Sequence, residues 1–195
     1  DLEGLDYILY PLHAEPELML AQFARPYLNQ IEVVRNIALS MPVGMHLLVK
    51  EHPITVGRRS MGYYKKLLEI PNVRMADMDL PAQPAVNNAR LVVVIRGSLA
   101  LEAVIRKIPV IGLGISLEQL LPTTMYKMCS NLYELPIAIR EMLNSYDYDH
   151  DALVRYLAAV IVGSVPANLV SDLLAKPERF RSDEFSRGRS FEEHP

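Results

Sequence analysis

The sequence has little of several features that would assign it quickly to a class of protein. Cys129 is the only cysteine among 195 residues, which excludes a disulfide within the chain and a zinc site built on cysteines, and fits a reducing compartment. No apolar run reaches the roughly 18 residues that a membrane-spanning helix needs. The net charge of −3 gives no basic surface for a nucleic-acid partner, so we expect none.

Two common nucleotide-binding signatures are also missing. The first apolar stretch, 7–11, is followed by neither a P-loop nor a Gly-x-Gly-x-x-Gly motif. Their absence argues against ATP hydrolysis and against an NAD- or FAD-dependent dehydrogenase. Any phosphate must therefore be bound by a local arrangement of groups, because the surface as a whole is not basic.

What the chain does contain is a regular alternation of apolar runs and helical patterns. Strands are predicted at 7–11, 46–50, 91–95 and 108–112, with another after a turn within 70–75. Helices are predicted at 17–24, 29–41, 61–68 and 99–106, and 78–88 is predicted to hold a loop and a short helix centred on Ala85-Val86. Strands that alternate with helices at this spacing indicate βαβ units, and hence an α/β fold with a doubly wound parallel sheet.

The end of the chain has a different character. Helices are predicted at 136–143, 151–162 and 167–174, whereas 177–195 is charged and poor in aliphatic residues. We interpret 1–176 as one domain with C-terminal helices, and 177–195 as a surface tail or a segment that packs on another domain. The chain begins at Asp1 and enters a strand almost at once. We therefore expect it to be the C-terminal domain of a longer protein.

The stretch 91–104 is the best candidate for a binding site. Its apolar strand runs into Arg96-Gly97-Ser98 and then a helical pattern, with Ser98 expected as the N-cap. Such a turn can bind an anion through free backbone N–H groups and the helix dipole. Polar stretches at 13–17, 51–59 and 112–116 also follow strands, and in doubly wound sheets these ends border one ligand crevice.

Two of these stretches carry candidate phosphate ligands. His52 can donate a hydrogen bond to a phosphate oxygen and, as imidazolium, can help a phosphate to leave, which makes it the candidate catalytic residue. The alternative is a histidine that caps its own loop through a backbone carbonyl. Arg58 and Arg59 precede a helix, where a guanidinium can clamp a phosphate or carboxylate. We expect one of them to face solvent and take Arg58 as the candidate.

His13, Glu15 and Glu17 form a polar cluster after the first strand. They could bind a metal or act as acid and base, but neither an HxxxH spacing nor a pair of suitably spaced carboxylates supports a metal site. Pro16 and the tight spacing favour a rigid rim that touches a donor or acceptor substrate. We expect no metal here.

Several motifs, taken in order, resemble a known family. They are the first strand with LHAEPE, the helix with NQIEVVRNIALSMPVG, and then HLLVKEHP, GRRSMGYYKKLLEIPNVRM, RGSLALEAV and IPVIGLG, and the likeness covers about two-thirds of the chain. The set resembles the C-terminal, donor-binding half of bacterial capsule polysaccharide biosynthesis proteins, the group that includes the capsule β-Kdo transferases. The resemblance implies a GT-B glycosyltransferase, in which two Rossmann-like domains flank a cleft and the second domain holds the nucleotide-sugar.

The resemblance also assigns roles to individual residues. It implies that His52 and Pro53, together with Gly97 and Ser98, contact the donor nucleotide, and that Glu102 holds its ribose. It suggests a CMP-activated sugar such as CMP-Kdo, which would be a substrate, so no cofactor is expected.

The resemblance implies partners and a location as well. A glycan or glycolipid would be the acceptor, and an N-terminal GT-B domain would supply the acceptor site and the catalytic base, so this part alone should be inactive. The expected location is the cytoplasm, with peripheral association at the inner face of the inner membrane through the full-length protein.

The chain departs from the family pattern at two places, and two other functions stay open. Arg96 stands where a small or hydroxyl residue is expected, and Arg106-Lys107 stands where a glycine is usual. One alternative is a nucleotide-sugar 2-epimerase with a similar Gly-Ser…Glu placement, which would use a UDP-sugar. The other is a binding or scaffold domain that kept the fold and lost turnover.

Overall fold

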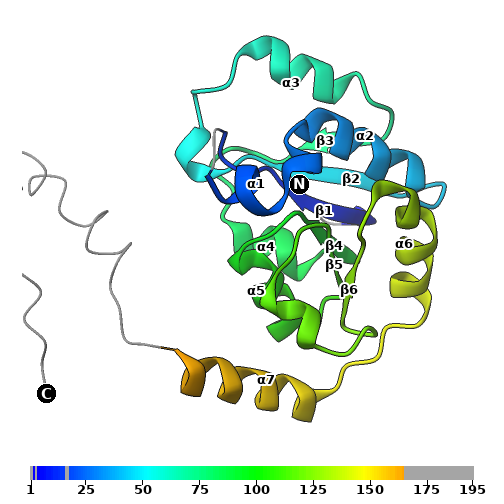
Figure 1. Cartoon of the computed structure of the whole chain (residues 1–195). Helices are drawn as coiled ribbons and strands as arrows, with labels where there is room; N and C mark the ends of the chain where they lie inside the picture. The colour runs from blue at the N-terminus through cyan, green and yellow to red at the C-terminus, as the bar shows by residue number, and fades with distance from the viewer. Residues whose placement is uncertain (1, 3, 16–17, 165–195) are drawn as a thin grey trace, which may run out of the picture. The chain divides into compact units, whose positions relative to one another are not determined.

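The computed structural model describes residues 2, 4–15 and 18–164, and within them a parallel sheet of six strands (Figure 1). The strands are β1 (Tyr7–Pro11), β2 (His46–Lys50), β3 (Val73–Met75), β4 (Leu91–Val94), β5 (Val110–Gly112) and β6 (Tyr126–Met128). All neighbouring pairs are parallel, in the order β3-β2-β1-β4-β5-β6. This is the strand order of Rossmann folds, so the predicted doubly wound α/β sheet is confirmed.

Helices connect these strands, and most lie close to their predicted positions. They are α1 (Leu18–Phe23), α2 (Gln30–Ser40), α3 (Met61–Leu68), α4 (Ala82–Asn87), α5 (Ser98–Ile105), α6 (Leu135–Asn144) and α7 (His150–Gly163). The sixth strand was not expected. It is only three residues long, with a lysine at its centre, so it lacks the apolar run by which the other strands were recognised.

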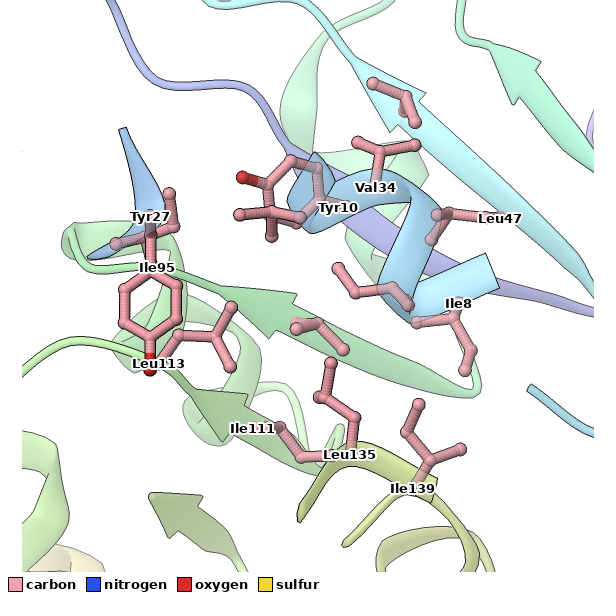
Figure 2. Close-up of a cluster of buried hydrophobic side chains, with 14 of the residues drawn as sticks. Ile8, Tyr10, Tyr27, Val34, Leu47, Ile95, Ile111, Leu113, Leu135 and Ile139 are labelled. Atoms are coloured by element: carbon pink, nitrogen blue, oxygen red, sulfur yellow. The ribbon is translucent and has the colours of Figure 1, made fainter. Parts of the chain in front are cut away.

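Helices cover both faces of the sheet, and successive strand residues point to opposite faces. Ile8 and Tyr10 of β1 belong to a core cluster with residues of α2 and α6, such as Val34 and Ile139 (Figure 2). Tyr7 points to the other face, where its hydroxyl donates a 2.7 Å hydrogen bond to the carbonyl of Ala85 in α4. This burial on two sides explains why the strands are continuous apolar runs.

The described residues up to Leu157 form one compact unit, and those from Ala158 to residue 164 fall outside it. The predicted helix 167–174, the tail 177–195 and the boundary between 176 and 177 lie outside the described residues and stay predictions. No helix in the described part of the chain has the length and apolar character needed to cross a membrane.

Two glycines of the IPVIGLG motif are required by close packing. A Cβ atom added at Gly112 would lie 1.7 Å from the hydroxyl oxygen of Tyr126 on the neighbouring strand, and one added at Gly114 would lie 2.8 Å from the Ile95 carbonyl oxygen. The Tyr126 hydroxyl in turn lies 2.9 Å from the hydroxyl of Ser116. Because Gly112 has no side chain, there is room for the Tyr126 ring, and its hydroxyl reaches Ser116 in the loop after β5.

Lys107 occupies a left-handed conformation, with φ of 61°. Helix α5 ends in a Schellman motif, in which Lys107 N–H bonds the Val104 carbonyl and Ile108 N–H bonds the Ala103 carbonyl, at 3.0 and 2.9 Å. This position normally favours glycine, which has no Cβ to clash. The structure thus gives a physical reason for the glycine that the family pattern places before IPV, and shows that lysine fills the position under backbone strain.

We predict that Lys107→Gly will be more stable than Lys107→Ala by about 1 kcal/mol, because only glycine relieves the left-handed strain. Both variants lose the contact of Lys107 Nζ with the Tyr148 ring, 5.2 Å from its centroid, so that loss cancels in the comparison. Urea unfolding monitored by circular dichroism measures the difference. Equal stability of the two variants would contradict the prediction.

Candidate functional site

An open crevice of about 520 Å³ lies at the carboxyl ends of β1, β2 and β4. The order of the sheet reverses between β1 and β4, and such switch points are where doubly wound sheets bind ligands. Six of the predicted site residues line this crevice: His13, His52, Pro53, Gly97, Ser98 and Glu102. Three of the four predicted stretches therefore meet there, whereas the fourth, 112–116, does not line this crevice and contributes only Ser116 to a neighbouring cavity.

The turn from β4 into α5 depends on Gly97. Its φ of 113° and ψ of 170° fall in a region that only glycine adopts without strain. Gly97 is itself the N-cap, and Ser98 is the first helical residue, so the expectation of Ser98 as N-cap is wrong. A serine N-cap needs an extended backbone just before the helix, and that place is taken by Gly97.

The start of α5 presents its groups to the crevice. Gly97, Ser98 and Leu99 all line it, so the unbonded N–H groups of the first turn lie at its wall. Glu102, one turn further on, is partly buried and also lines the crevice. Among the described residues, no side chain is hydrogen-bonded or ion-paired to the Glu102 carboxylate, so its oxygens can accept hydrogen bonds from a ligand.

His52 caps its own loop and keeps one nitrogen for other partners. Its Nδ1 accepts a 3.2 Å hydrogen bond from the backbone N–H of Ile54, at the start of a 3-10 turn over Pro53–Thr55. An amide N–H only donates, so Nδ1 carries no proton and the neutral ring carries its proton on Nε2. His52 therefore caps its loop as the alternative expected, but it does so by accepting from a backbone N–H and not through a backbone carbonyl, while Nε2–H can donate to a ligand.

His13 joins the loops after β1 and β4. The side chain is buried, and its Nε2 lies 2.6 Å from the carbonyl oxygen of Arg96. The His13 backbone is held in turn by Gln30, which accepts from its N–H at 2.7 Å and donates to its carbonyl at 3.1 Å. His13 thus fixes the spacing of two crevice walls.

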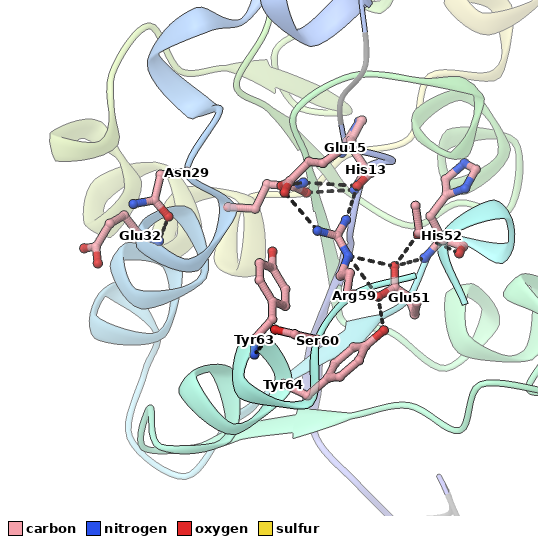
Figure 3. A network of polar contacts seen from close by, with 12 residues as sticks. His13, Glu15, Asn29, Glu32, Glu51, His52, Arg59, Ser60, Tyr63 and Tyr64 are labelled. Atoms are coloured by element: carbon pink, nitrogen blue, oxygen red, sulfur yellow. Dashed lines mark hydrogen bonds and ion pairs between the residues drawn. The ribbon is translucent and has the colours of Figure 1, made fainter. Parts of the chain in front are cut away.

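A buried ion pair between Glu51 and Arg59 lies behind these loops (Figure 3). Arg59 Nε donates to Glu51 Oε2 at 3.0 Å, and the guanidinium also pairs with Glu15 and donates to the His13 carbonyl. Glu51 further accepts from the backbone N–H of His52 at 2.7 Å. One ion pair therefore holds both of the loops that carry the crevice histidines.

Hydrogen bonds keep this pair charged. Burial by itself would raise the pKa of Glu51, but hydrogen bonds from Thr55, Tyr64 and the His52 N–H, together with the Arg59 charge, lower it below its ordinary 4.5. The same contact with Glu51, added to burial, raises the pKa of Tyr64 to about 12. A permanently charged pair cannot exchange protons at neutral pH, so Glu51 and Arg59 position other groups.

The structure separates the remaining candidates from the crevice. Arg58 is exposed and does not line the crevice, so the structure does not place it where it could bind a phosphate there. Arg59, and not Arg58, is the arginine whose side chain is buried. Glu15 lies at the exposed side of the Arg59 network, and Glu17 lies outside the described residues. Within 2, 4–15 and 18–164, no three His, Cys, Asp or Glu side chains are grouped so that they could hold a metal ion.

We predict that Glu51→Gln will lower the free energy of unfolding by about 3 kcal/mol at pH 7, since it removes the fully buried one of the two carboxylates that pair with Arg59. The folded-state pKa of Glu51 is lowered, so its stabilisation is complete above about 4.5 and is lost as the pH falls through the folded value. The difference between wild type and variant should therefore shrink in acid, as measured by urea unfolding from pH 7 to pH 3.

Glu141→Gln is the matched control for this experiment. Glu141 pairs with Lys127 at the surface, where its side chain is 50% exposed, and such pairs contribute about 1 kcal/mol or less. A Glu51→Gln effect as small as that of the control, or one that does not change with pH, would show that the buried pair does not stabilise the loops.

We predict that Gly97→Ala will cost about 1–3 kcal/mol, because alanine is strained at this φ and ψ. A Cβ atom at residue 97 meets nothing within 4 Å, so the cost arises from the backbone alone. Gly62→Ala, in the first turn of α3, is the control and should be neutral or slightly stabilising. Chemical denaturation of the two variants provides the measurement, and equal effects would refute the assignment.

Comparisons with known proteins show the fold. No family model and no curated protein matches the chain. Among solved structures, it is similar to UDP-GlcNAc 2-epimerase from Methanocaldococcus jannaschii in complex with UDP-GlcNAc and UDP, with a TM-score of 0.53, 20% identity, and coverage of 82% of this chain and 46% of that one.

Two transferases show similar agreement. The β-Kdo 2,7 transferase KpsC of Thermosulfurimonas dismutans has a TM-score of 0.51 at 16% identity, over 83% of this chain and 55% of that one. The spinosyn rhamnosyltransferase SpnG in complex with spinosyn aglycone has 0.52 at 16% identity, over 87% and 45%. The chain spans about half the length of these proteins. At these identities, the comparisons show that the chain has a Rossmann-like domain of the GT-B type.

Proposed function

We propose that this chain is the nucleotide-sugar-binding domain of a glycosyltransferase. The observation that carries the proposal is the convergence of His52, Gly97-Ser98 and Glu102 on one crevice at the switch point of the sheet. Together these groups offer what a nucleotide needs: hydrogen-bond donors for a phosphate, and a carboxylate that can accept from the ribose hydroxyls.

Each group has a defined task in this proposal. The N–H groups at the start of α5 bind a phosphate, helped by the helix dipole. His52 Nε2–H donates to the same phosphate and stabilises the negative charge that develops when the sugar leaves. Glu102 accepts hydrogen bonds from ribose hydroxyls, and Pro53 keeps the loop that carries His52 rigid.

The proposal extends to a CMP-sugar such as CMP-Kdo and to the synthesis of capsule or surface polysaccharide. The ordered motifs described above and the likeness in fold to a β-Kdo 2,7 transferase support it. A glycan or glycolipid would be the acceptor, and a further GT-B domain would supply the catalytic base. The reaction would take place in the cytoplasm, at the inner face of the inner membrane.

A second candidate is a 2-epimerase-like domain that uses a UDP-sugar. The likeness in fold to a UDP-GlcNAc 2-epimerase bound to UDP favours it, and the two candidates differ in the nucleotide that they require. A scaffold domain without turnover is a third candidate, for which Arg96 and Lys107 are the supporting departures.

We predict that isothermal titration calorimetry will show binding of CMP in preference to CDP, UMP and UDP. His52→Ala should weaken CMP binding by at least about tenfold, because a hydrogen bond to a charged group contributes about 1.5–3 kcal/mol. His150→Ala is the control, since His150 is exposed at the start of α7 and is not part of the crevice; it should leave affinity unchanged.

The other outcomes separate the candidates. A preference for UDP would favour the epimerase, and failure to bind any of the four nucleotides would refute the proposed function. An assay of sugar transfer by a longer protein that contains this chain would then distinguish an enzyme from a scaffold.

A further inference from the structure

A smaller cavity of about 280 Å³ adjoins the nucleotide crevice and has no role in the function proposed above. Its lining residues are His13, Leu20, Arg96, Gly97, Ser116, Leu117 and Glu118. It shares His13, Arg96 and Gly97 with the larger crevice. A ligand whose phosphate lies at Gly97 can therefore extend from one space into the other.

Arg96 brings a positive charge to this cavity. Its guanidinium carbon lies 4.8 Å from the centroid of the Phe23 ring on α1, the helix that also supplies Leu20 to the lining. Ser116, which lines the same cavity, is hydrogen-bonded to Tyr126. Burial raises the pKa of Tyr126 and its hydrogen bond with Ser116 lowers it, while the Glu118 charge raises it and the Arg96 charge lowers it. Both charges therefore act on the Ser116–Tyr126 pair.

The guanidinium of Arg96 lacks a counter-ion within the described part of the chain. Each ion pair there involves other residues, and the Nη1 atom is buried without a hydrogen-bond acceptor. Arg59, by contrast, is paired with two carboxylates. A buried donor without an acceptor is costly, so the unused capacity of Arg96 points to an acidic group that arrives with a ligand.

Glu118 restricts what that acidic group can be. Glu118 lines the same cavity as Arg96 and is not ion-paired with it, so the lining residues carry both a positive and a negative charge. A second phosphate would suit Arg96 but would be repelled by Glu118. A sugar that carries a carboxylate suits both, because its hydroxyls can donate to Glu118 and to the Ser116 oxygen.

We propose that the smaller cavity is a subsite for an acidic sugar, with Arg96 binding the carboxylate of that sugar. A guanidinium matches a carboxylate in bidentate fashion, and the Phe23 ring supports the face of the guanidinium. This inference rests on the proposed function, because the nucleotide in the crevice delivers the sugar to the cavity. Arg96, a departure from the family pattern, then determines which sugar is accepted.

The test compares CMP with CMP-N-acetylneuraminate, a nucleotide-sugar with a carboxylate, and with UDP, which carries a second phosphate, by calorimetry on the full chain. Arg96→Gln should weaken binding of CMP-N-acetylneuraminate by at least about tenfold more than it weakens binding of CMP, because the hydrogen-bonded charge that is lost contacts the sugar. Arg96→Lys should fall between wild type and Arg96→Gln, since it keeps the charge and loses the bidentate geometry. Urea unfolding of both variants checks that they are folded.

The outcomes separate this inference from the proposed function. Equal losses for CMP and CMP-N-acetylneuraminate would place Arg96 in the nucleotide site and overturn the inference, as would no loss for either. A loss for UDP alone would identify the partner of Arg96 as a second phosphate and also overturn it. If the wild type binds no nucleotide, the proposed function fails, and titration of free N-acetylneuraminic acid by NMR decides the subsite: shifts at Ser116 that Arg96→Gln abolishes support it, and their absence refutes it.

Discussion

The geometry of the site depends on the buried ion pair between Glu51 and Arg59. Taking two charges out of water is unfavourable unless every remaining hydrogen-bonding position is filled, and here Thr55, Tyr64 and the His52 N–H fill those of Glu51. Arg59 extends the network to the His13 carbonyl. Because the bonds to the His52 N–H and to the His13 carbonyl end on backbone atoms, the pair fixes the course of two loops.

The sheet explains why these loops meet at all. Parallel strands end at one edge, and the reversal of order between β1 and β4 leaves a gap there that no connection covers. Short connections of different chemistry then line the gap: a capped histidine loop, a glycine turn and a helix N-terminus. The Rossmann-like fold supplies the position, while the side chains supply the chemistry, so the likeness in fold to both epimerases and transferases does not by itself decide between them.

The parallel sheet and the convergence of three of its loops could be predicted from the sequence. Strands buried on both faces are continuous apolar runs, as 91–95 shows, so the alternation of such runs with helical patterns was enough to predict both. The rest depended on tertiary contacts. No local signal distinguishes Arg58 from Arg59, because the difference is the presence of Glu51 and Glu15 in space. The short strand β6 is held by pairing with β5, and the identity of the α5 N-cap depends on a backbone angle at Gly97.

The packing of Tyr126 over Gly112 has a consequence for how such a domain can change its substrate. Position 112 accepts no side chain, since even a methyl group would displace the tyrosine ring, and with it the partner of Ser116. Substitution of Gly112, next to the smaller cavity, is therefore strongly disfavoured. A new substrate specificity must arise from substitutions at residues that line the cavity, of which Arg96 and Glu118 are charged, while Gly112 and Tyr126 stay unchanged.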